Sequence, residues 1–365
     1  MSGKKVVITG GHHNCALVVA EKLRRRGWQV FWFGHKFTML KDQRLSAEYQ
    51  EVKKAGFDFY EIKAGKISRN DRLSYLFRLP QGFVQSADRL LKIKPDLIIS
   101  FGGYLAVPVV VTGWFLRIPS ITHEQTAVYG WANCLIGRLA QKILVSWSSS
   151  LKHFPAKKVV FTGLPLRKEI FLKGRKISFN NKKPTIYITG GKQGSHLLNQ
   201  AVGSSLKALL LSYNLIHQCG SNSIFNDRLW LERLARHLPS GLRKNYLVRD
   251  YFYRDQIGPV FASADLIVSR AGAHTVYEIA ALGKPALLIP IPWSHAREQQ
   301  KNAQRLEKIG LAEILPQDRL SPKSLIEALA GMAADLDFYR QNAPKALNLI
   351  SLDAAEKIVD LVEKL

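Results

Sequence analysis

The sequence predicts an α/β protein with two Rossmann-like domains, and three observations support this. The chain has 365 residues, more than the ~250–300 at which a single hydrophobic core stops growing. Two segments share the order strand, Gly-Gly turn and helix: "KKVVITGGHHNCALVVAEKLRRRG" from Lys4 and "TIYITGGKQGSHLLNQAV" from Thr185. Short apolar runs alternate with helical patterns along both halves, which indicates parallel strands buried on both faces.

Each apolar run is a predicted strand, in chain order. The two glycine-turn segments supply the first strand of each domain. The others are "QVFWFG" at Gln29, "PDLIISFGG" at Pro95, "KILVSW" at Lys142, "LIHQCG" at Leu215, "ADLIVSR" at Ala264 and "PALLIPIP" at Pro285. The basic, polar stretch "FLKGRKISFNNKKP", Phe171 to Pro184, is the predicted linker. Two such domains facing each other would form a cleft lined by glycine turns.

The charge balance indicates an anionic partner. Lys and Arg number 53 against 28 Asp and Glu, a net charge of +25, which favours nucleic acid, an acidic membrane surface or phosphorylated small molecules without choosing among them. The three cysteines are far apart and predict neither a disulfide framework nor a zinc site. The longest apolar run, Tyr104 to Leu116, is shorter than the ~20 residues of a spanning helix, so we expect no membrane crossing.

Two glycine turns are candidate anion sites. In Thr9 to His13, Gly10 and Gly11 let backbone N–H groups approach an anion at a helix N-terminus, although a tight turn without a ligand is an equal alternative. The turn Thr189 to His196 is stronger, because it places Gly191, Lys192 and Gln193 ahead of a helix. It lacks the P-loop spacing, so ATP hydrolysis is not expected.

A third segment completes the features of a nucleotide-sugar site. After the strand "LIVSR", the turn at Gly272 can direct N–H groups to a diphosphate, and Glu278 can accept both hydroxyls of a ribose. The alternative for Glu278 is stabilisation of the helix start. Glu298 and Gln299, an acceptor beside an amide, suit the vicinal hydroxyls of a sugar. Their order within one domain indicates a nucleotide-sugar donor.

These motifs together resemble the MurG family. They are "FGGYLAVPVVV", "ITHEQTAVYGWANCLIGRLA", "FTGLPLR", "ITGGKQG", "SRAGAHTVYEIAALGKPALLIPIP" and "EQQKNA". The resemblance implies a GT-B glycosyltransferase at the cytoplasmic face of the cell membrane, bound peripherally, which moves N-acetylglucosamine from UDP-GlcNAc to undecaprenyl-linked lipid I and so makes lipid II for peptidoglycan. It implies an acceptor and membrane domain of residues 1–170, a donor domain of residues 171–347, and a C-terminal helix within 348–365 that packs back on the first domain.

The resemblance also assigns residues. On the acceptor side it places Tyr104, His123, Glu124 and Gln125. At the donor it places Thr9, Gly10, Gly11, His12, Thr126, Arg167, Gly191, Lys192, Gln193, Phe252, Gly272, Ala273, His274, Thr275, Val276, Glu278, Glu298 and Gln299, with the backbone near Phe252 contacting uracil. The chain departs from the family pattern in three places: it has "VITGGH" in place of GGTGGH, Thr126 in place of Asn, and Lys192 in place of Ser.

The expected chemistry is a displacement with inversion at the anomeric carbon. His12 is the predicted base, since a histidine with a reference pKa near 6.5 suits proton transfer at neutral pH. The alternative is that His12 only hydrogen-bonds the diphosphate or caps its helix, and Glu124 is the rival base. No cofactor is expected. No metal ligand set is expected either, because the Asp-x-Asp at Asp335 lies in a polar helix and not at a strand end.

Charged and apolar residues from Glu61 to Lys94 predict an anionic membrane surface as a partner. Eight basic residues face three acidic ones and alternate with Leu73, Tyr75, Leu76, Phe77, Leu79 and Phe83; Trp114 and Phe115 extend this surface. The alternative is an ordinary amphipathic helix packed on its own domain. Three alternatives remain open: a UDP-GlcNAc 2-epimerase-like isomerase, a GT-B transferase with another lipid or glycan acceptor, and a nucleic-acid-binding protein. The last leaves the glycine turns without a purpose, so no nucleic acid is expected.

Overall fold

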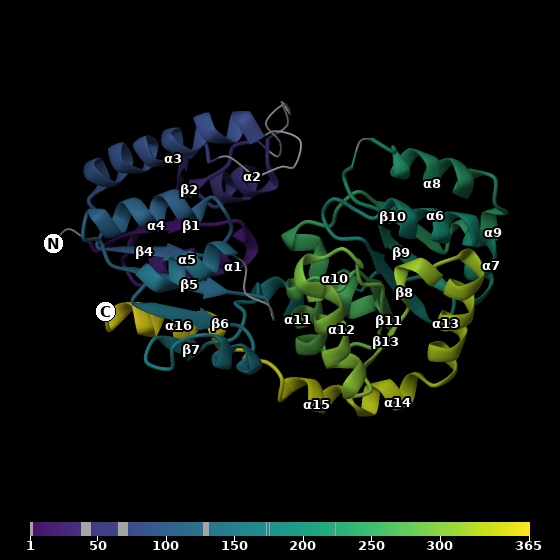
Figure 1. The fold of residues 1–365 in the computed structure, drawn as a ribbon. Coiled ribbons are helices and arrows are strands. Elements are labelled where there is room, and N and C mark those ends of the chain that lie inside the picture. Colours follow the sequence, from purple (N-terminus) through teal and green to yellow (C-terminus); the bar gives the residue numbers. More distant parts are fainter. Residues whose placement is uncertain are drawn as a thin grey trace. The chain divides into compact units, whose positions relative to one another are not determined.

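A computed structural model describes most of the chain as two compact units. The described residues are 3–37, 45–64, 72–126, 131–172, 174, 176–222 and 224–365. Unit 1 comprises Met1–Arg167 together with Ser351–Leu365, and unit 2 comprises Lys168–Ile350. The chain therefore passes between the units twice, and Figure 1 shows the yellow C-terminal helix among the purple and blue elements of unit 1.

Unit 1 is a parallel sheet covered by helices on both faces (Figure 1). Its strands run in the order β3-β2-β1-β4-β5-β6-β7. They are β1 (Lys5–Thr9), β2 (Gln29–Gly34), β3 (Asp58–Glu61), β4 (Leu97–Ser100), β5 (Ser120–Glu124), β6 (Lys142–Val145) and β7 (Val159–Phe161). The helices are α1 (His13–Arg25), α2 (Ala47–Lys54), α3 (Arg72–Ile93), α4 (Ala106–Phe115), α5 (Trp131–Leu139), the 3-10 helix η1 (Ser148–His153) and α16 (Ala354–Glu363).

Unit 2 repeats the architecture with the order β10-β9-β8-β11-β12-β13. Its strands are β8 (Thr185–Thr189), β9 (Asn214–Gln218), β10 (Tyr246–Arg249), β11 (Leu266–Ser269), β12 (Ala286–Leu288) and β13 (Ala312–Ile314). Its helices are η2 (Lys168–Phe171), α6 (His196–Ser204), α7 (Leu206–Ser212), α8 (Asp227–Arg236), α9 (Ser240–Arg243), α10 (Arg254–Ser263), α11 (Ala273–Leu282), η3 (His295–Arg297), α12 (Glu298–Lys308), η4 (Gln317–Arg319), α13 (Pro322–Ala334), α14 (Leu336–Gln341) and α15 (Ala343–Leu347). The predicted pair of parallel α/β sheets is confirmed.

Apolar strands create the two cores. Val7 in β1 and Ile98 in β4 are fully buried with Val109 of α4 in one core, and Ile188 in β8 and Val268 in β11 are fully buried in the other. Strands buried on both faces need apolar side chains on both, which explains the continuous Val and Ile runs.

The C-terminal helix α16 docks on α1 through ion pairs and apolar burial. Arg26, the residue after α1, donates to Glu363 at 2.8 Å and contacts Asp360 at 3.4 Å, and Lys22 pairs with Glu356. Because these side chains are a third to a half exposed, solvent screens the ion pairs and each contributes little to stability. Apolar burial of Ile358 and Val359 therefore contributes most to the docking of α16.

A histidine buried in β9 predicts that unit 2 loses stability in acid. His217 is 0 % exposed; its Nε2 donates to Asn199 Oδ1 at 3.0 Å and its Nδ1 accepts from the Tyr246 hydroxyl at 2.9 Å. Burial lowers the pKa of His217 to about 3, whereas in the unfolded chain it is about 6.5. Below pH ~6.5 the unfolded state therefore binds a proton that the folded state does not, and stability falls.

The expected slope is about 1.4 kcal/mol of unfolding free energy per pH unit from this one residue. Urea unfolding at pH 7.5, 6 and 5 measures it. His217→Gln should make the decline toward pH 5 shallower, while the exposed His237→Gln should not. An equally steep decline in His217→Gln would contradict the assignment.

Candidate functional site

Both sheets have a switch point where the strand order reverses. In unit 1 it lies between β1 and β4, and in unit 2 between β8 and β11. Ligands of open α/β sheets bind outside the carboxyl ends of the strands at this point. The turns after β1, β8 and β11 are those that the sequence predicts as anion sites. Each unit thus has a candidate ligand-binding edge.

The turn after β1 requires glycine. Gly10 has φ of 128°, and a Cβ there would lie 2.7 Å from the carbonyl oxygen of Gly102. Gly11 N donates to the same oxygen at 3.0 Å. Thr9 is fully buried at the end of β1. The turn is therefore fixed directly against the loop that follows β4.

His12 is oriented by that same loop. It is the residue before α1, and its Nδ1 lies 2.9 Å from the carbonyl oxygen of Phe101. A carbonyl oxygen only accepts, so Nδ1 carries the hydrogen, and in the neutral ring Nε2 carries the lone pair. This is the tautomer that a base acting through Nε2 requires.

Hydrogen bonds to Glu124 stabilise the turn after β5. It is 3 % exposed. Its Oε1 accepts from Thr126 N at 3.0 Å and from Thr126 Oγ1 at 2.8 Å, and its Oε2 accepts from Asn133 Nδ2 at 2.7 Å. Asn133 Oδ1 in turn accepts from Thr122 Oγ1 at 3.2 Å. Three donors already occupy this carboxylate, which favours a positioning role for Glu124 over that of a base.

The other three residues predicted for the acceptor side differ in exposure. Tyr104 is 38 % exposed, whereas His123 and Gln125 are 1 % and 8 % exposed. His123 Nε2 donates to Gly163 O at 2.9 Å, and burial lowers its pKa to about 4. Gln125 Oε1 accepts from Cys15 Sγ at 3.5 Å. This burial favours a supporting role for His123 and Gln125, and their acceptor contacts stay predictions. Arg167 is half-buried at the end of the first stretch of unit 1.

In unit 2 the turn after β8 is packed against the loop after β9. Gly194 has φ of 80°, and a Cβ there would lie 2.0 Å from Cys219 O, so only glycine fits. Ser221 N donates to Lys192 O at 3.1 Å, and the Lys192 ammonium lies 5.4 Å from the centre of the Tyr251 ring. Gly191 is half-buried and Gln193 is exposed. The turn thus presents a cation beside Tyr251, the residue before Phe252, and Phe252 itself is 4 % exposed.

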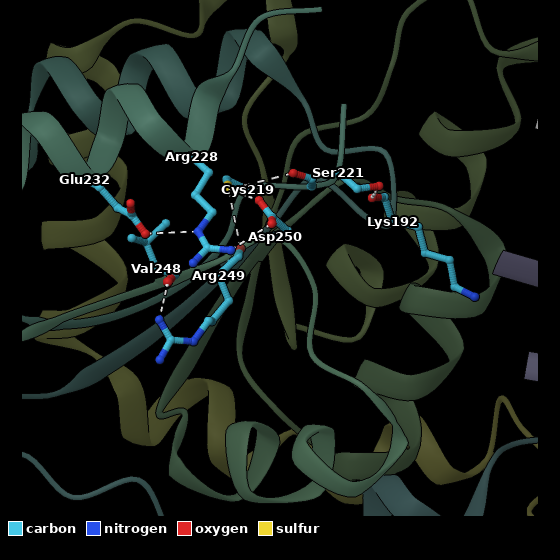
Figure 2. A network of polar contacts seen from close by, with 9 residues as sticks. Lys192, Cys219, Ser221, Arg228, Glu232, Val248, Arg249 and Asp250 are labelled. Atoms are coloured by element: carbon cyan, nitrogen blue, oxygen red, sulfur yellow. Dashed lines mark hydrogen bonds and ion pairs between the residues drawn. The ribbon is translucent and has the colours of Figure 1, made fainter. Parts of the chain in front are cut away.

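A network of polar side chains lies beside the loops after β9 and β10. Figure 2 shows Arg228 between Glu232 and Asp250, with the Lys192 side chain extending away from them. The Arg228 guanidinium lies 2.9 Å from Glu232 Oε1 and 2.8 Å from Asp250 Oδ2. Burial is the main cause that raises the pKa of the Cys219 thiol to about 12. Cys219 is therefore an uncharged packing group at neutral pH.

The turn after β11 leads into α11, whose first turn faces the same edge. Gly272 precedes the helix; Ala273 and Val276 are buried, and His274 and Thr275 are half-buried. Glu278 is 4 % exposed, with Oε1 3.4 Å from His274 Nδ1. Glu278 lies beyond the first turn of α11, where the helix dipole has fallen off, so helix-start stabilisation is a weak account of this carboxylate.

Arg270 joins three strand ends of unit 2. Its Nη2 donates to Ser195 Oγ at 2.6 Å, after β8, and its Nη1 donates to Ile289 O at 3.0 Å, after β12, while Arg270 itself follows β11. Burial lowers the pKa of Arg270 to about 10, so the guanidinium stays charged at neutral pH. It adds fixed positive charge beside both glycine turns.

Glu298 and Gln299 are the first residues of α12. Hydrogen bonds connect them to the loops at the carboxyl ends of the strands of unit 2. Gln299 Oε1 accepts from Ile291 N at 3.1 Å. Asn302, fully buried, places Nδ2 3.2 Å from Ala271 O and 3.4 Å from Glu298 Oε1. Its amide therefore connects the turn after β11 to the predicted sugar-binding pair.

Sequence reasoning missed four residues that support the site: Asn133, Gln218, Arg270 and Asn302. Arg270 and Gln218 carried a detectable signal, because each is a polar residue at the carboxyl end of an apolar strand. Within the ranges that the structure covers, His, Cys, Asp and Glu nowhere gather into a group of three that could hold a metal ion. None of the helices described is both long and apolar enough to cross a membrane.

Two doubly wound parallel sheets, each with its glycine turns at the switch point, define the class of GT-B glycosyltransferases. Residues 7–145 match the N-terminal domain of glycosyltransferase family 28, and residues 185–363 match its C-terminal domain. The chain belongs to this family and, within it, to the MurG family. The family that the motifs indicated is confirmed.

Relatives match almost the whole chain. A Bacillus cereus protein named UDP-N-acetylglucosamine--N-acetylmuramyl-(pentapeptide) pyrophosphoryl-undecaprenol N-acetylglucosamine transferase 2 is 32% identical over 92% of this chain and 94% of its own. A Clostridium tetani protein of the same transferase name, without the number, is 30% identical over 99% and 98%. The crystal structure of Acinetobacter baumannii MurG matches with a TM-score of 0.72 and 27% identity, covering 99% of this chain and all of that one.

A UDP-GlcNAc 2-epimerase from Neisseria meningitidis also shares the fold. Its TM-score is 0.65 at 15% identity, over 99% of this chain and 100% of that one. At this identity the likeness concerns the fold alone.

Proposed function

We propose that the chain transfers N-acetylglucosamine from UDP-GlcNAc to the muramoyl 4-hydroxyl of lipid I, with inversion and without a metal, and so produces lipid II. The observation that carries the proposal is the position of Glu278, a buried carboxylate in the first turns of α11 beside the glycine turn at the switch point. The names of relatives that match over nine-tenths of the chain supply the two substrates.

The donor roles follow from the chemistry of the edge of unit 2. The N-termini of α6 and α11 direct N–H groups and their helix dipoles toward the diphosphate. Lys192 adds a cation, and Glu278 accepts the ribose hydroxyls. Glu298 and Gln299 bind the sugar hydroxyls, and the backbone at Phe252 contacts uracil.

His12 acts as the base. In the neutral tautomer set by Phe101 O, its Nε2 accepts the proton of the acceptor hydroxyl as that oxygen attacks the anomeric carbon. The bond to the diphosphate breaks on the opposite face, and the departing uridine diphosphate takes the electron pair. Helix N-termini and cationic side chains stabilise the charge that develops there. Thr9, Gly10 and Gly11 hold His12 in place.

A transfer assay tests the proposal. The protein is incubated with labelled UDP-GlcNAc and a lipid I analogue in the presence of a chelator, and the disaccharide product is expected. Donor isomerised without acceptor would instead support an epimerase. Transfer only to another lipid or glycan would support a related GT-B transferase, and salt-sensitive duplex binding unaffected by UDP would support a nucleic-acid-binding protein.

A lipid acceptor requires contact with a membrane, and α4 provides a candidate surface. Trp114 and Phe115 are 52% and 73% exposed at the end of α4, their ring centres are 5.0 Å apart, and exposed Arg117 follows. Exposed aromatic rings beside a cation suit adsorption to anionic lipid. Peripheral attachment at the cytoplasmic face is therefore part of the proposal. Of the predicted surface on α3, Phe83 is half-buried, and the side chains of residues 72–79 lie outside those described.

Phe115→Glu is expected to weaken binding to anionic phospholipid vesicles at least about tenfold, because it removes an inserted ring and adds a repelled charge. Co-sedimentation with vesicles of 30% anionic lipid measures this. The matched control is Leu229→Glu on α8, where the native side chain is 62% exposed. Equal binding by both variants would place the membrane contact elsewhere.

A further inference from the structure

Gln218 lies at the carboxyl end of the sheet of unit 2. None of the donor roles described above uses it. It is the last residue of β9, which pairs with β8 on one side and β10 on the other. Its side chain is 4 % exposed. From this position it reaches both the glycine turn after β8 and the loop after β10.

All four hydrogen-bonding positions of its carboxamide are used. Nε2 donates to Thr189 Oγ1 at 3.0 Å and to Gly191 O at 3.2 Å. Oε1 accepts from Phe252 N at 3.0 Å and from the Tyr187 hydroxyl at 3.5 Å. One buried amide therefore joins the anion-binding turn to the loop at Phe252.

The amide orientation is fixed by these partners. A backbone carbonyl such as Gly191 O only accepts, and a backbone N–H such as that of Phe252 only donates, so the oxygen and nitrogen of Gln218 cannot be exchanged. Glutamate would keep the shape but lose both donors and place a charge against Gly191 O. A buried polar group left without its partner costs about 1–3 kcal/mol.

The same hydrogen bonds fix the first residues of the glycine turn after β8. Thr189 Oγ1 accepts from Gly191 N at 3.0 Å as well as from Gln218. Both backbone polar groups of Gly191 are thus tied to Thr189 or Gln218. A displacement of the Gln218 amide would move this turn and the Phe252 backbone relative to each other.

We propose that Gln218 is a positioning residue that sets the base selectivity of the donor site, by holding the Phe252 backbone in register with the glycine turn at Gly191. This rests on the proposed function, in which those two segments bind the uracil and the diphosphate of one ligand. The diphosphate anchors the nucleotide, and the base then meets backbone groups whose position Gln218 fixes. Sites that match a ligand's polar groups reject an analogue whose groups do not match, because buried partners are left unpaired.

The test compares affinities for UDP and CDP, which differ in the base edge and carry the same diphosphate. Calorimetric titration of the full-length wild-type chain gives a UDP-to-CDP affinity ratio, and Gln218→Glu is expected to lower that ratio at least about tenfold, the equivalent of one lost ~1.4 kcal/mol interaction. Both ligands meet the added carboxylate equally. Simple charge repulsion therefore cancels in the ratio.

Asn214→Asp is the matched control. Asn214 begins the same strand, is 2 % exposed, and its amide donates to Asn181 Oδ1 at 3.0 Å and Lys183 O at 2.9 Å, at the opposite end of the sheet. This variant should lose comparable stability in thermal unfolding while keeping the wild-type ratio. A fall in the ratio for both variants would mean that general loosening, and not position, is responsible.

Other outcomes separate the inference from the proposed function. A wild-type ratio near one would count against a uridine donor and so against the proposed function itself. A high wild-type ratio that Gln218→Glu retains would overturn the role of Gln218 alone. If Gln218→Glu does not fold, Thr189→Val decides, because it removes one bond to the Gln218 amide and should lower the ratio at least about threefold; an unchanged ratio would reject the inference.

Discussion

Replacing His12 by alanine is expected to lower kcat by about 10²–10⁴-fold, the range that general base catalysis contributes. The KM for UDP-GlcNAc should change much less, because in the proposed mechanism His12 Nε2 accepts the proton of the acceptor hydroxyl and does not bind the donor. Steady-state kinetics with UDP-GlcNAc and a lipid I analogue measures both constants.

His13→Ala is the matched control for this experiment. His13 is the next residue, yet its Nε2 faces Glu51 Oε2 of α2 at 3.3 Å, so its removal should leave kcat within a few-fold of wild type. A higher donor KM in His12→Ala with kcat unchanged would assign His12 to the diphosphate. If kcat instead collapses in Glu124→Gln and survives in His12→Ala, then Glu124 is the base.

The sequence revealed the central strands because they are buried on both faces. The central residues of β1, β4, β8 and β11 are apolar and buried, and these strands flank the two switch points. The four edge strands β3, β7, β10 and β13 gave no such signal. Each has only three or four residues, and most of these are half-buried or exposed, so alternation is too short to detect.

Strand β5 escaped prediction for a different reason. Its sequence, Ser120 to Glu124, is mostly polar, although every residue in it is buried. Thr122 donates a hydrogen bond to Asn133, Glu124 accepts one from it, and His123 donates to Gly163 O. A strand that supplies hydrogen bonds to a site loses the apolar pattern by which strands are recognised.

The glycine turns were predictable, whereas their supports were not. Gly10 and Gly194 adopt left-handed conformations against neighbouring backbone, and this need leaves a direct mark in the sequence. The amides of Gln218 and Asn302 act across strands that are distant in the chain, and no spacing rule predicts such a partner. The same limit applies to the exposure of His123, which depends on the packing around β5.

Glu278→Ala is expected to weaken UDP binding by ~10²-fold or more. The carboxylate is the proposed acceptor for two ribose hydroxyls, and hydrogen bonds to a charged group contribute about 1.5–3 kcal/mol each. It lies beyond the first turn of α11, so the helix-dipole stabilisation lost with it should be small in comparison. Calorimetric titration with UDP, with thermal unfolding in parallel, measures both effects.

A deoxy ligand makes the ribose assignment specific. For the wild type, 2′-deoxy-UDP should bind at least about tenfold more weakly than UDP, since one charged hydrogen bond is lost. In Glu278→Ala the two nucleotides should bind almost equally, because the acceptor that distinguishes them is gone. Glu307→Ala, which removes an exposed acid on α12, should keep the wild-type difference. A deoxy penalty of undiminished size in Glu278→Ala would place the ribose against another group, and the proposed donor geometry would then be wrong.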